Sequence, residues 1–410
     1  MKILLIDVYN FNKGGAETVC FNTGKLLEKH GHKVVYFCLK WTGNNPSPYS
    51  KYFPESKETR KGMLRQVRNM VNYFYHFEAA KKMERLLMEE KPDIAHIHLI
   101  WGQITPSILP VLKKFHVPIL FTVHDYRIVC PAYTFRNGKG KICEECKGRL
   151  FYKCFIHSCC KGNKIMSAIM AAEQYFRNEF FSPTKYIDGF LYVSNFAKSI
   201  QEKYMPSIKD TPNITLYNFS TDIVGKNKMT VKTKYYLFFG RLSYEKGVKT
   251  LLEAFKDLPE SHLKIVGTGP KEKELKNYIA TYGMKNVEFV GYKKGHELTD
   301  LVRKAYFVIV PSEWYENNPM AIIEAYSTGT PILGARIGGI PEIVIEKETG
   351  YLFMSGNSED LKNKVELVDG LTAEKYSKLS EGVLKFAGEN LSTENYYPKL
   401  IAFYNRFLHK

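Results

Sequence analysis

Short apolar runs alternate with longer amphipathic segments along the whole chain. Between the runs lie helical patterns, for example over 16–30, 79–91, 248–257, 271–282 and 319–328. Strands that alternate with helices form βαβ units, whose parallel sheets are covered on both faces. The ten apolar runs predicted as strands are Ile3–Val8, Lys33–Cys38, Ile94–His98, Ile119–Val123, Gly189–Val193, Tyr235–Phe239, Leu263–Val266, Val287–Val290, Phe307–Val310 and Pro331–Leu333. Ten strands favour an α/β fold with two Rossmann-like, doubly wound parallel-sheet domains over a fold with one sheet.

The periodicity breaks at 218–234, a polar segment rich in Lys, Asn and Thr. We therefore predict a first domain over 1–217, a linker over 218–234 and a second domain over 235–390. The remaining residues, 391–410, include an amphipathic pattern over 393–408 that predicts a C-terminal helix. Pro398 is expected to kink this helix or to mark its start.

Composition places the chain among ordinary globular proteins. Of 410 residues, 44% are hydrophobic and 25% are charged, which excludes a disordered or collagen-like chain. No apolar stretch approaches the roughly 18 residues of a membrane-spanning helix. The first apolar run is also too short for the core of a signal peptide, so we expect a cytoplasmic protein.

The net charge of +17 is unevenly distributed, because residues 1–190 hold 29 basic and 16 acidic side chains. Such an excess suits nucleic acid, an anionic membrane surface or phosphorylated substrates, but a solvated basic surface explains it too. Residues 60–78 resemble a basic amphipathic helix, which either lies peripherally on a membrane or packs on its own sheet. Its basic and apolar residues are Arg60, Lys61, Arg65, Arg68, Met63, Leu64, Val67, Val71, Phe74 and Phe77.

The strand over 235–239 leads into a loop that carries two cations, Arg241 and Lys246, just before a helix. Ligands of open parallel sheets bind beyond the carboxyl ends of the strands. The helix dipole disfavours cations at this end, so the pair suggests an anion between them. Arginine grips a phosphate bidentately and lysine supplies a point charge, so the loop predicts a diphosphate site. The alternative is a pair of solvated surface cations.

Two glutamates follow the strand over 307–310. We predict that Asn318 caps a helix and that Pro319 is its first residue, which leaves Glu316 in the loop ahead. Glu324 lies inside this helix among apolar neighbours, where an unpaired carboxylate is costly. Its partners are expected to be either sugar hydroxyls or an internal cation.

Weaker signals lie at other strand ends. Gly14 and Gly15 open a helix after the first strand, and such a turn lets the backbone approach a phosphate or simply joins a strand to a helix. Gly267 and the Gly338–Gly339 pair lie in further glycine-rich loops. His124 ends the strand over 119–123, where it either faces a cleft or is a satisfied structural residue.

Residues 130–160 fit no βαβ unit and hold six of the eight cysteines. One Cys-x-x-Cys pair is typical of structural zinc, but the second pair is adjacent instead of spaced. Reduced thiols and disulfides remain alternatives to zinc. The candidate zinc ligands are Cys130, Cys143, Cys146, Cys159 and Cys160. We interpret the segment as an insertion that shapes an acceptor site.

Taken together and in this order, these motifs resemble the retaining glycosyltransferases of family 4, which have the GT-B fold with an interdomain cleft. The resemblance implies that Arg241 and Lys246 hold the donor diphosphate, with Gly14 and Gly15 touching it from the first, acceptor-binding domain. It assigns Glu324 to the ribose and Glu316 to the transferred sugar. By the same likeness, His124, Asn317 and Asn318 lie near the sugar, and Gly267 and Tyr292 near the base. The resemblance also implies that the C-terminal helix in 391–410 packs back on the first domain.

The family also implies the reaction. We expect a retaining, metal-independent transfer from a nucleotide-sugar donor, more often UDP than GDP, to a saccharide or polyprenyl-linked acceptor in bacterial surface polysaccharide synthesis. No cofactor is expected for catalysis, because no Asp-x-Asp triplet occurs in the chain. Pro319 departs from the family pattern and removes one N–H, which leaves the sugar open. A nucleotide-sugar epimerase is one alternative. A basic, zinc-bearing nucleic-acid-binding protein is another, but the chain has no recognisable nucleic-acid-binding motif, so we expect no nucleic-acid partner.

Overall fold

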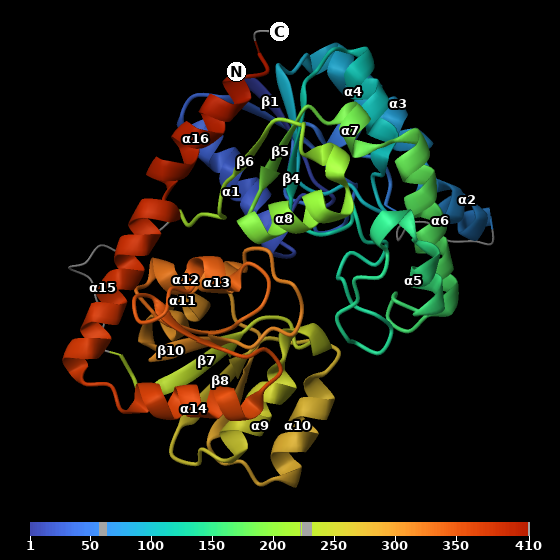
Figure 1. Ribbon diagram of the computed structural model, residues 1–410. Coiled ribbons are helices and arrows are strands. Elements are labelled where there is room, and N and C mark those ends of the chain that lie inside the picture. Colours follow the sequence, from blue (N-terminus) through green and yellow to red (C-terminus); the bar gives the residue numbers. More distant parts are fainter. Residues whose placement is uncertain (57–63, 222, 224–231, 409–410) are drawn as a thin grey trace. The chain divides into compact units, whose positions relative to one another are not determined.

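The computed structural model describes residues 1–56, 64–221, 223 and 232–408 (Figure 1). The chain divides into two compact units. The first contains Met1–Leu216 together with the chain from Tyr397 onward, and the second contains Tyr217–Tyr396. Most of the segment predicted as a linker, 218–234, lies outside the described residues.

The first unit is built on a parallel sheet with the strand order β2-β1-β3-β4-β5-β6. Its strands are β1 (Lys2–Ile6), β2 (Lys33–Phe37), β3 (Ile94–Ile97), β4 (Ile119–Val123), β5 (Gly189–Tyr192) and β6 (Asn213–Thr215). Its helices are α1 (Gly15–Lys29), α2 (Leu64–Phe74), α3 (Phe77–Glu90), α4 (Leu109–Lys114), α5 (Tyr152–Ile156), α6 (Lys164–Phe180), α7 (Pro183–Tyr186) and α8 (Asn195–Tyr204). The central strands β3, β4 and β5 are buried along their whole length, as expected for a parallel sheet covered on both faces.

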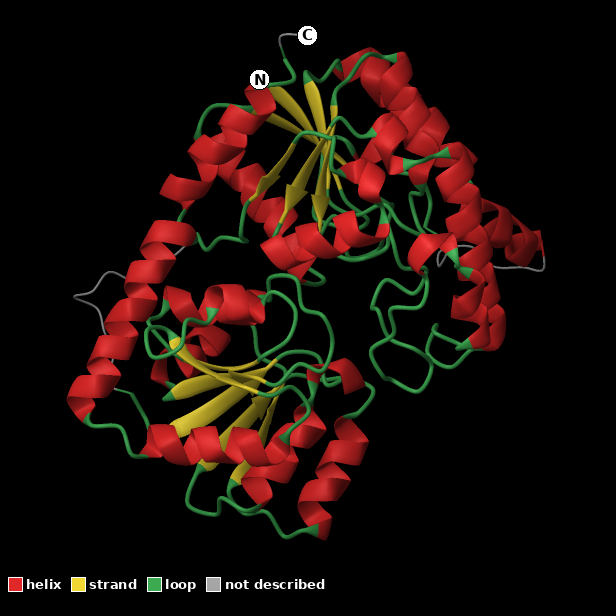
Figure 2. Ribbon diagram, in the orientation of Figure 1, coloured by secondary structure: helices red, strands yellow, loops and turns green. Residues whose placement is uncertain are grey.

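The second unit repeats this plan with the strand order β12-β11-β10-β7-β8-β9. Its strands are β7 (Tyr235–Phe239), β8 (His262–Val266), β9 (Val287–Gly291), β10 (Phe307–Val310), β11 (Ile332–Ala335) and β12 (Gly350–Phe353). Its helices are α9 (Val248–Lys256), α10 (Glu272–Thr281), α11 (Gly295–Lys304), α12 (Met320–Ser327), α13 (Ile340–Ile343), α14 (Ser358–Asp369) and α15 (Ala373–Asn390). In each unit, helices flank a fan of parallel strands (Figure 2). Two separate apolar clusters, one on each face of the second sheet, form the core of the second unit.

The prediction of two doubly wound α/β sheets is confirmed, and all ten predicted strands are present. Two strands were missed. β6 has only three residues, and none of them is fully buried. β12 begins at Gly350, where a Cβ would collide with the backbone of Ile332 on the neighbouring strand. Both are edge strands with a weak local signal, because β6 is short and mostly polar and β12 begins with a glycine.

The last helix, α16 (Thr393–Asn405), contains Pro398 in its interior instead of at its start. The Tyr404 hydroxyl lies 2.6 Å from Nδ1 of His96 on β3. Phe403 and Phe407 pack so closely over Gly189 of β5 that a Cβ there would lie within 3 Å of both rings. The end of the chain is thus part of the core of the first unit.

The basic helix predicted over 60–78 is only partly described. Arg60, Lys61 and Met63 lie outside the described residues, and α2 ends at Phe74. His76 then caps α3 by accepting a hydrogen bond from the backbone N–H of Ala79, so one continuous helix to residue 78 is wrong. The ring of Phe74 packs against Phe176 of α6, with centroids 5.6 Å apart. Among the described helices, none is long and apolar enough to span a membrane.

Candidate active site

Loops of the second unit interlock beyond the carboxyl ends of β7, β8 and β10. Gly247 has a φ of +67°, and a side chain there would collide with the carbonyl of Pro311. Gly267 has a φ of +133°, and a side chain there would collide with the carbonyl of Gly240. Only glycine combines such angles with such contacts. These glycines hold three loops against one another and so fix the positions of the side chains that the loops carry.

The loop after β11 fixes the backbone of Glu316 in the same way. Gly338 has a φ of +60°, and a Cβ there would lie 2.6 Å from the backbone nitrogen of Glu316. The backbone N–H of Gly339 donates to the carbonyl of Glu316 at 2.7 Å. The Gly-Gly turn therefore positions this glutamate.

The Glu316 carboxylate is almost fully buried, and one of its oxygens, Oε1, interacts with two donors. Nζ of Lys246 lies 2.7 Å from Oε1, and the hydroxyl of Ser312 donates to Oε1 at 2.7 Å. Burial acts to raise the pKa of Glu316, but the Lys246 ammonium and the hydrogen bonds outweigh it and lower that pKa. Glu316 is therefore an anion that depends on Lys246.

The two predicted phosphate-binding cations differ in their surroundings. The Lys246 side chain is 27% exposed, and its ammonium lies 5.4 Å from the centroid of the Trp314 ring. Since an ammonium has three N–H donors, the contact with Glu316 leaves others for a ligand. Arg241 is exposed, and no described residue pairs with its guanidinium. Leu242 between them is fully buried and anchors the loop.

Glu324 lies on α12 between the buried side chains of Ile323 and Ala325. In the part of the chain that the structure describes, no donor binds its carboxylate, so an internal ion pair to Arg or Lys is not found there. Burial raises the pKa of Glu324 to about 7. A costly, uncompensated carboxyl is typical of a binding site, where a ligand supplies the missing donors.

The predicted start of α12 is wrong by one residue. The capping residue is Pro319, with φ −69° and ψ 124°, and the helix begins at Met320. Asn318 instead pairs with Asn218. Its side-chain oxygen accepts from the Asn218 N–H, and its carbonyl accepts from the Asn218 side chain, both at 2.8 Å. Asn317 is also buried.

The two residues expected near the base lie at adjacent strand ends. The backbone N–H of Gly267 donates to the carbonyl of Gly291 at 2.9 Å, directly before Tyr292. The Tyr292 side chain is 65% exposed, so its ring is available for stacking. The structure therefore brings Gly267 and Tyr292 together.

In the first unit, Gly14 and Gly15 form the start of α1, with Gly14 as its extended N-cap. Sequence reasoning missed Glu17, whose carboxylate oxygen would lie 3.2 Å from a Cβ at Gly14. Burial raises the pKa of Glu17, and the Lys13 charge acts in the opposite direction. This carboxyl beside the turn would repel a phosphate when it is ionised, so its protonation bears on the role predicted for the two glycines.

His124 has a histidine partner that sequence reasoning also missed. Nε2 of His124 lies 2.9 Å from Nδ1 of His98, and the two rings stack with centroids 5.1 Å apart. Burial lowers the pKa of both rings, that of His124 to about 3, so both are neutral. The signal was present, because His98 directly follows β3 just as His124 follows β4.

Nε2 of His98 is buried and has no hydrogen-bond partner among the described residues. Because a buried N–H without an acceptor is costly, we place the proton on Nδ1 of His98. Nδ1 then donates to Nε2 of His124, which leaves the proton of His124 on its own Nδ1. His98 therefore sets the tautomer of His124.

The structure does not support zinc binding by the cysteine-rich segment. All eight cysteines are free, and no three His, Cys, Asp or Glu side chains in the described residues are placed to hold a metal ion. A hydrogen bond to Cys159, together with burial, raises the pKa of the Cys143 thiol. Burial raises the pKa of Cys146 to about 12. The described cysteines are therefore best interpreted as reduced thiols.

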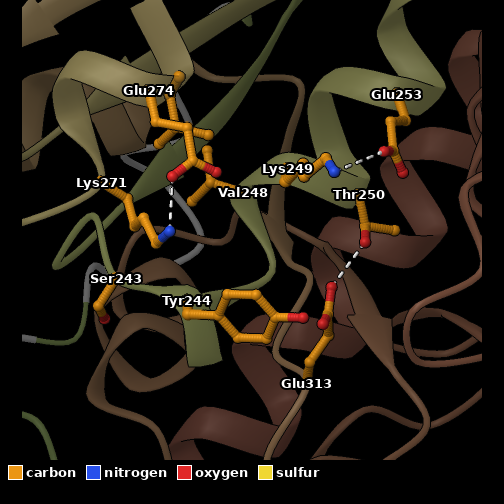
Figure 3. Close-up of a pocket in the computed structure, with 10 residues that line it drawn as sticks. Ser243, Tyr244, Val248, Lys249, Thr250, Glu253, Lys271, Glu274 and Glu313 are labelled. Atoms are coloured by element: carbon orange, nitrogen blue, oxygen red, sulfur yellow. Dashed lines mark hydrogen bonds and ion pairs between the residues drawn. The ribbon is translucent and has the colours of Figure 1, made fainter. Parts of the chain in front are cut away.

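A pocket of 190 Å³ lies beside the loop that carries the two cations (Figure 3). It is lined by Ser243, Tyr244, Val248, Lys249, Thr250, Glu253, Lys271, Glu274, Leu275 and Glu313. None of the residues predicted to bind the donor is among them. Its charged groups already have partners within the lining: Lys271 contacts Glu274 at 2.5 Å, Lys249 contacts Glu253 at 3.7 Å, and the Thr250 hydroxyl donates to Glu313 at 2.6 Å. We therefore do not place the diphosphate there.

Two family models match the chain and together span most of it. Residues 220–382 match the glycosyl transferases group 1, and residues 13–153 match glycosyltransferase family 4. An uncharacterized glycosyltransferase of Methanocaldococcus jannaschii is 25% identical over 394 residues, which are 95% of this chain and 92% of the relative. An uncharacterized 42.6 kDa protein in the cps region of Klebsiella pneumoniae is also 25% identical, over 84% of this chain and 87% of its own.

Solved structures share the fold of the whole chain. Sucrose-phosphate synthase from Thermosynechococcus elongatus aligns with a TM-score of 0.70 at 16% identity, over 99% of this chain and 98% of its own. The Anabaena protein HepE, solved in complex with UDP and glucose, aligns with a TM-score of 0.64 at 17% identity, over 98% of each chain.

Proposed function

Because the chain belongs to glycosyltransferase family 4 and has the GT-B fold, we propose that it is a retaining transferase whose second unit binds a nucleoside-diphosphate sugar at the interlocked loops. The observation that carries this proposal is the placement of two cations and an unsatisfied carboxyl on segments that follow β7 and β10, which are neighbours in the second sheet. Lys246 and Arg241 would bind the diphosphate, and Glu324 would accept hydrogen bonds from the ribose.

The chemistry follows from where charge develops. As the bond between the sugar carbon and the phosphate oxygen breaks, the leaving diphosphate gains negative charge. Arg241 and Lys246 are fixed cations that would stabilise it. The acceptor hydroxyl would pass its proton to the leaving phosphate oxygen as its own oxygen bonds to the sugar carbon. Glu316, held by Lys246 and Ser312, would contact the transferred sugar. We propose that these cations do the work without a divalent metal.

The donor and acceptor are proposed more specifically. UDP is favoured over GDP by the likeness to HepE, whose structures contain UDP and UDP-glucose. A saccharide or polyprenyl-linked acceptor in surface polysaccharide synthesis is supported by the Klebsiella relative in its cps region. A putative colanic acid biosynthesis glycosyltransferase of Escherichia coli, 30% identical over 135 residues, which are 30% of this chain and 33% of its own, adds to this support. The proposed place of action is the cytoplasmic face of a membrane.

We assign supporting roles to the other predicted residues. Gly14 and Gly15 are proposed to contact phosphate, provided that Glu17 is protonated or displaced. His124 would contact the sugar through a ring whose tautomer His98 sets. Gly267 and Tyr292 are proposed for the base, and the backbone at Asn317 and Asn318 for the sugar.

Incubation of the full chain with UDP-sugars, with and without saccharide or polyprenyl-phosphate acceptors, tests the proposal. Release of UDP that requires an acceptor, with retention of the anomeric configuration in the product, is the expected result and should survive EDTA. Conversion of the donor without any acceptor would instead identify an epimerase. Absence of UDP release from UDP-sugars and of GDP release from GDP-sugars, with correctly folded protein, would refute the proposed transfer.

A further inference from the structure

The short helix α5 presents apolar side chains on the face that does not pack into the protein. Cys154 and the preceding Phe151 are buried, as the inner face of a helix requires. Tyr152, Phe155 and Ile156 have the i, i+3, i+4 spacing of a single helix face, and they are 49%, 40% and 56% exposed. This outward face therefore has the character of a surface that meets an apolar partner.

The first turn of α6 extends the same surface. Ile165 is 74% exposed and Met166 is 39% exposed. The ammonium of Lys164 lies 5.1 Å from the centroid of the Phe155 ring, which places the start of α6 beside α5. The two helices also lie together in the ribbon (Figure 1). We call Tyr152, Phe155, Ile156, Ile165 and Met166 the apolar patch.

The segment that surrounds the apolar patch is basic and its acidic residues are already paired. Glu144 contacts Lys203 at 2.6 Å, and Glu145 contacts Lys153 at 3.2 Å. Five exposed lysines make no ion pair with any described residue, and these are Lys139, Lys141, Lys147, Lys161 and Lys164. The surface thus combines exposed apolar side chains with uncompensated positive charge.

We infer that the apolar patch and its five lysines dock the enzyme on an anionic lipid surface. Apolar side chains enter the boundary between head groups and acyl chains, and lysines around them are attracted to anionic head groups. A partner that explains only the lysines, or only the apolar side chains, does not account for the whole surface. A nucleic acid would use the lysines but would leave the apolar side chains in water, and a solvated basic face would carry no apolar centre.

A second copy of the chain is a poorer partner for this surface. A two-fold contact would bring the same patch of each copy together and would place the unpaired lysines against one another. An anionic bilayer meets both properties at once. The inference deepens the proposed function. The purpose of docking, which is to bring the enzyme to a lipid-linked acceptor, rests on that function, whereas the docking itself does not.

Vesicle co-sedimentation of the full chain tests the docking without any turnover. The probes are vesicles of phosphatidylcholine alone and of phosphatidylcholine with about a third phosphatidylglycerol. We expect partitioning on the order of tenfold stronger into the anionic vesicles, and loss of that preference in 0.5 M salt, because surface charges are screened.

Two variants locate the contact. Phe155→Ser with Ile156→Ser removes apolar insertion, and Lys161→Gln with Lys164→Gln removes two charges. Each is expected to weaken partitioning into anionic vesicles about tenfold. The matched controls lie on exposed positions of the second unit, Met354→Ser with Leu367→Ser and Lys273→Gln with Lys285→Gln, and should bind like the unaltered chain. Melting temperatures verify that every variant folds.

Equal binding to both kinds of vesicle, or equal loss in the patch and control variants, would overturn the inference. So would a change in oligomeric state by sedimentation velocity without vesicle binding, because it would identify a second copy as the partner. A UDP-induced thermal shift is measured in parallel. If the UDP-induced shift persists while vesicle binding fails, the docking is wrong and the proposed donor site stands. If vesicle binding persists while the shift is absent, the docking stands and the proposed donor site is wrong.

Discussion

The donor edge of the second sheet and the cysteine-rich segment 130–160 carry comparable amounts of sequence signal but differ in how well that signal predicted the structure. We call the loops beyond the carboxyl ends of the second sheet's strands, where the donor is proposed to bind, the donor edge. At the donor edge, Gly247, Gly267 and Gly338 each sit where any side chain would strike a neighbouring backbone. In the cysteine-rich segment, a thiol can equally be a zinc ligand, half of a disulfide or a small apolar residue. A motif is informative when its geometry admits few residue types, and ambiguous when one residue type serves several structures.

The largest expected effect concerns the ion pair at the donor edge. Lys246→Ala should lower transfer about a thousandfold, because a fixed cation is removed from the leaving group. It should also cost roughly 1–3 kcal/mol of unfolding free energy, because Glu316 is left buried and unpaired. Adding Glu316→Gln should restore much of the stability but not the activity. Urea unfolding and initial rates of both variants measure this, and full activity of Lys246→Ala would contradict the assigned role.

Glu324→Gln is expected to separate function from stability. Because the pKa of Glu324 is raised to about 7, the folded state holds a proton there that the unfolded state releases near 4.5. Ionised Glu324 therefore destabilises the fold as pH rises from about 4.5 to 7, and remains costly above 7. Glutamine should add roughly 2–3 kcal/mol of stability at pH 8 and nothing below pH 4.

Glu324→Gln should also lower the transfer rate by about 10- to 100-fold, and its donor affinity should no longer depend on pH. In the unaltered chain, affinity should rise as pH increases through 7, because the ionised carboxylate accepts ribose hydrogen bonds. Calorimetric titration of UDP at several pH values measures this. An unchanged pH profile in Glu324→Gln would separate Glu324 from the donor.

A smaller effect is expected from the pair His98–His124. Asparagine places its amide nitrogen near the position of Nδ1, whereas glutamine places its own near Nε2. His98→Asn should therefore keep transfer within a few-fold, and His98→Gln should lower kcat about tenfold with little change in KM for the acceptor. Long-range ¹H–¹⁵N spectra of His124 report its tautomer. The same tautomer in both variants would contradict positioning by His98.

The smallest effect is expected in the cysteine-rich segment. Cys143→Ser with Cys159→Ser exchanges one protonated, hydrogen-bonding group for another and should change unfolding free energy by only about 1 kcal/mol. Elemental analysis of the purified chain should find less than a tenth of an equivalent of zinc. One equivalent of zinc that this double variant loses, together with several kcal/mol of stability, would restore the metal interpretation.

Local patterns predicted ten strands, including β2 and β9 at the sheet edges, and the loops that follow them. They did not predict β6, which is short and mostly polar, or β12, which begins with a glycine. The start of α12 was misplaced because Asn318 is held by Asn218, one hundred residues away. Glu17 was missed for a similar reason, since its importance arises from what the fold places beside it. His98 was overlooked although its position directly after β3 matches that of His124 after β4.

The central claim is that Arg241, Lys246 and Glu324 form a nucleoside-diphosphate site, and a thermal-shift titration with UDP, GDP and UMP tests it most directly. We predict that UDP raises the melting temperature most, that UMP raises it least, and that Lys246→Ala abolishes the difference between them. An unchanged melting temperature at millimolar concentrations of both UDP and GDP, or an undiminished UDP shift in Lys246→Ala, would contradict the claim.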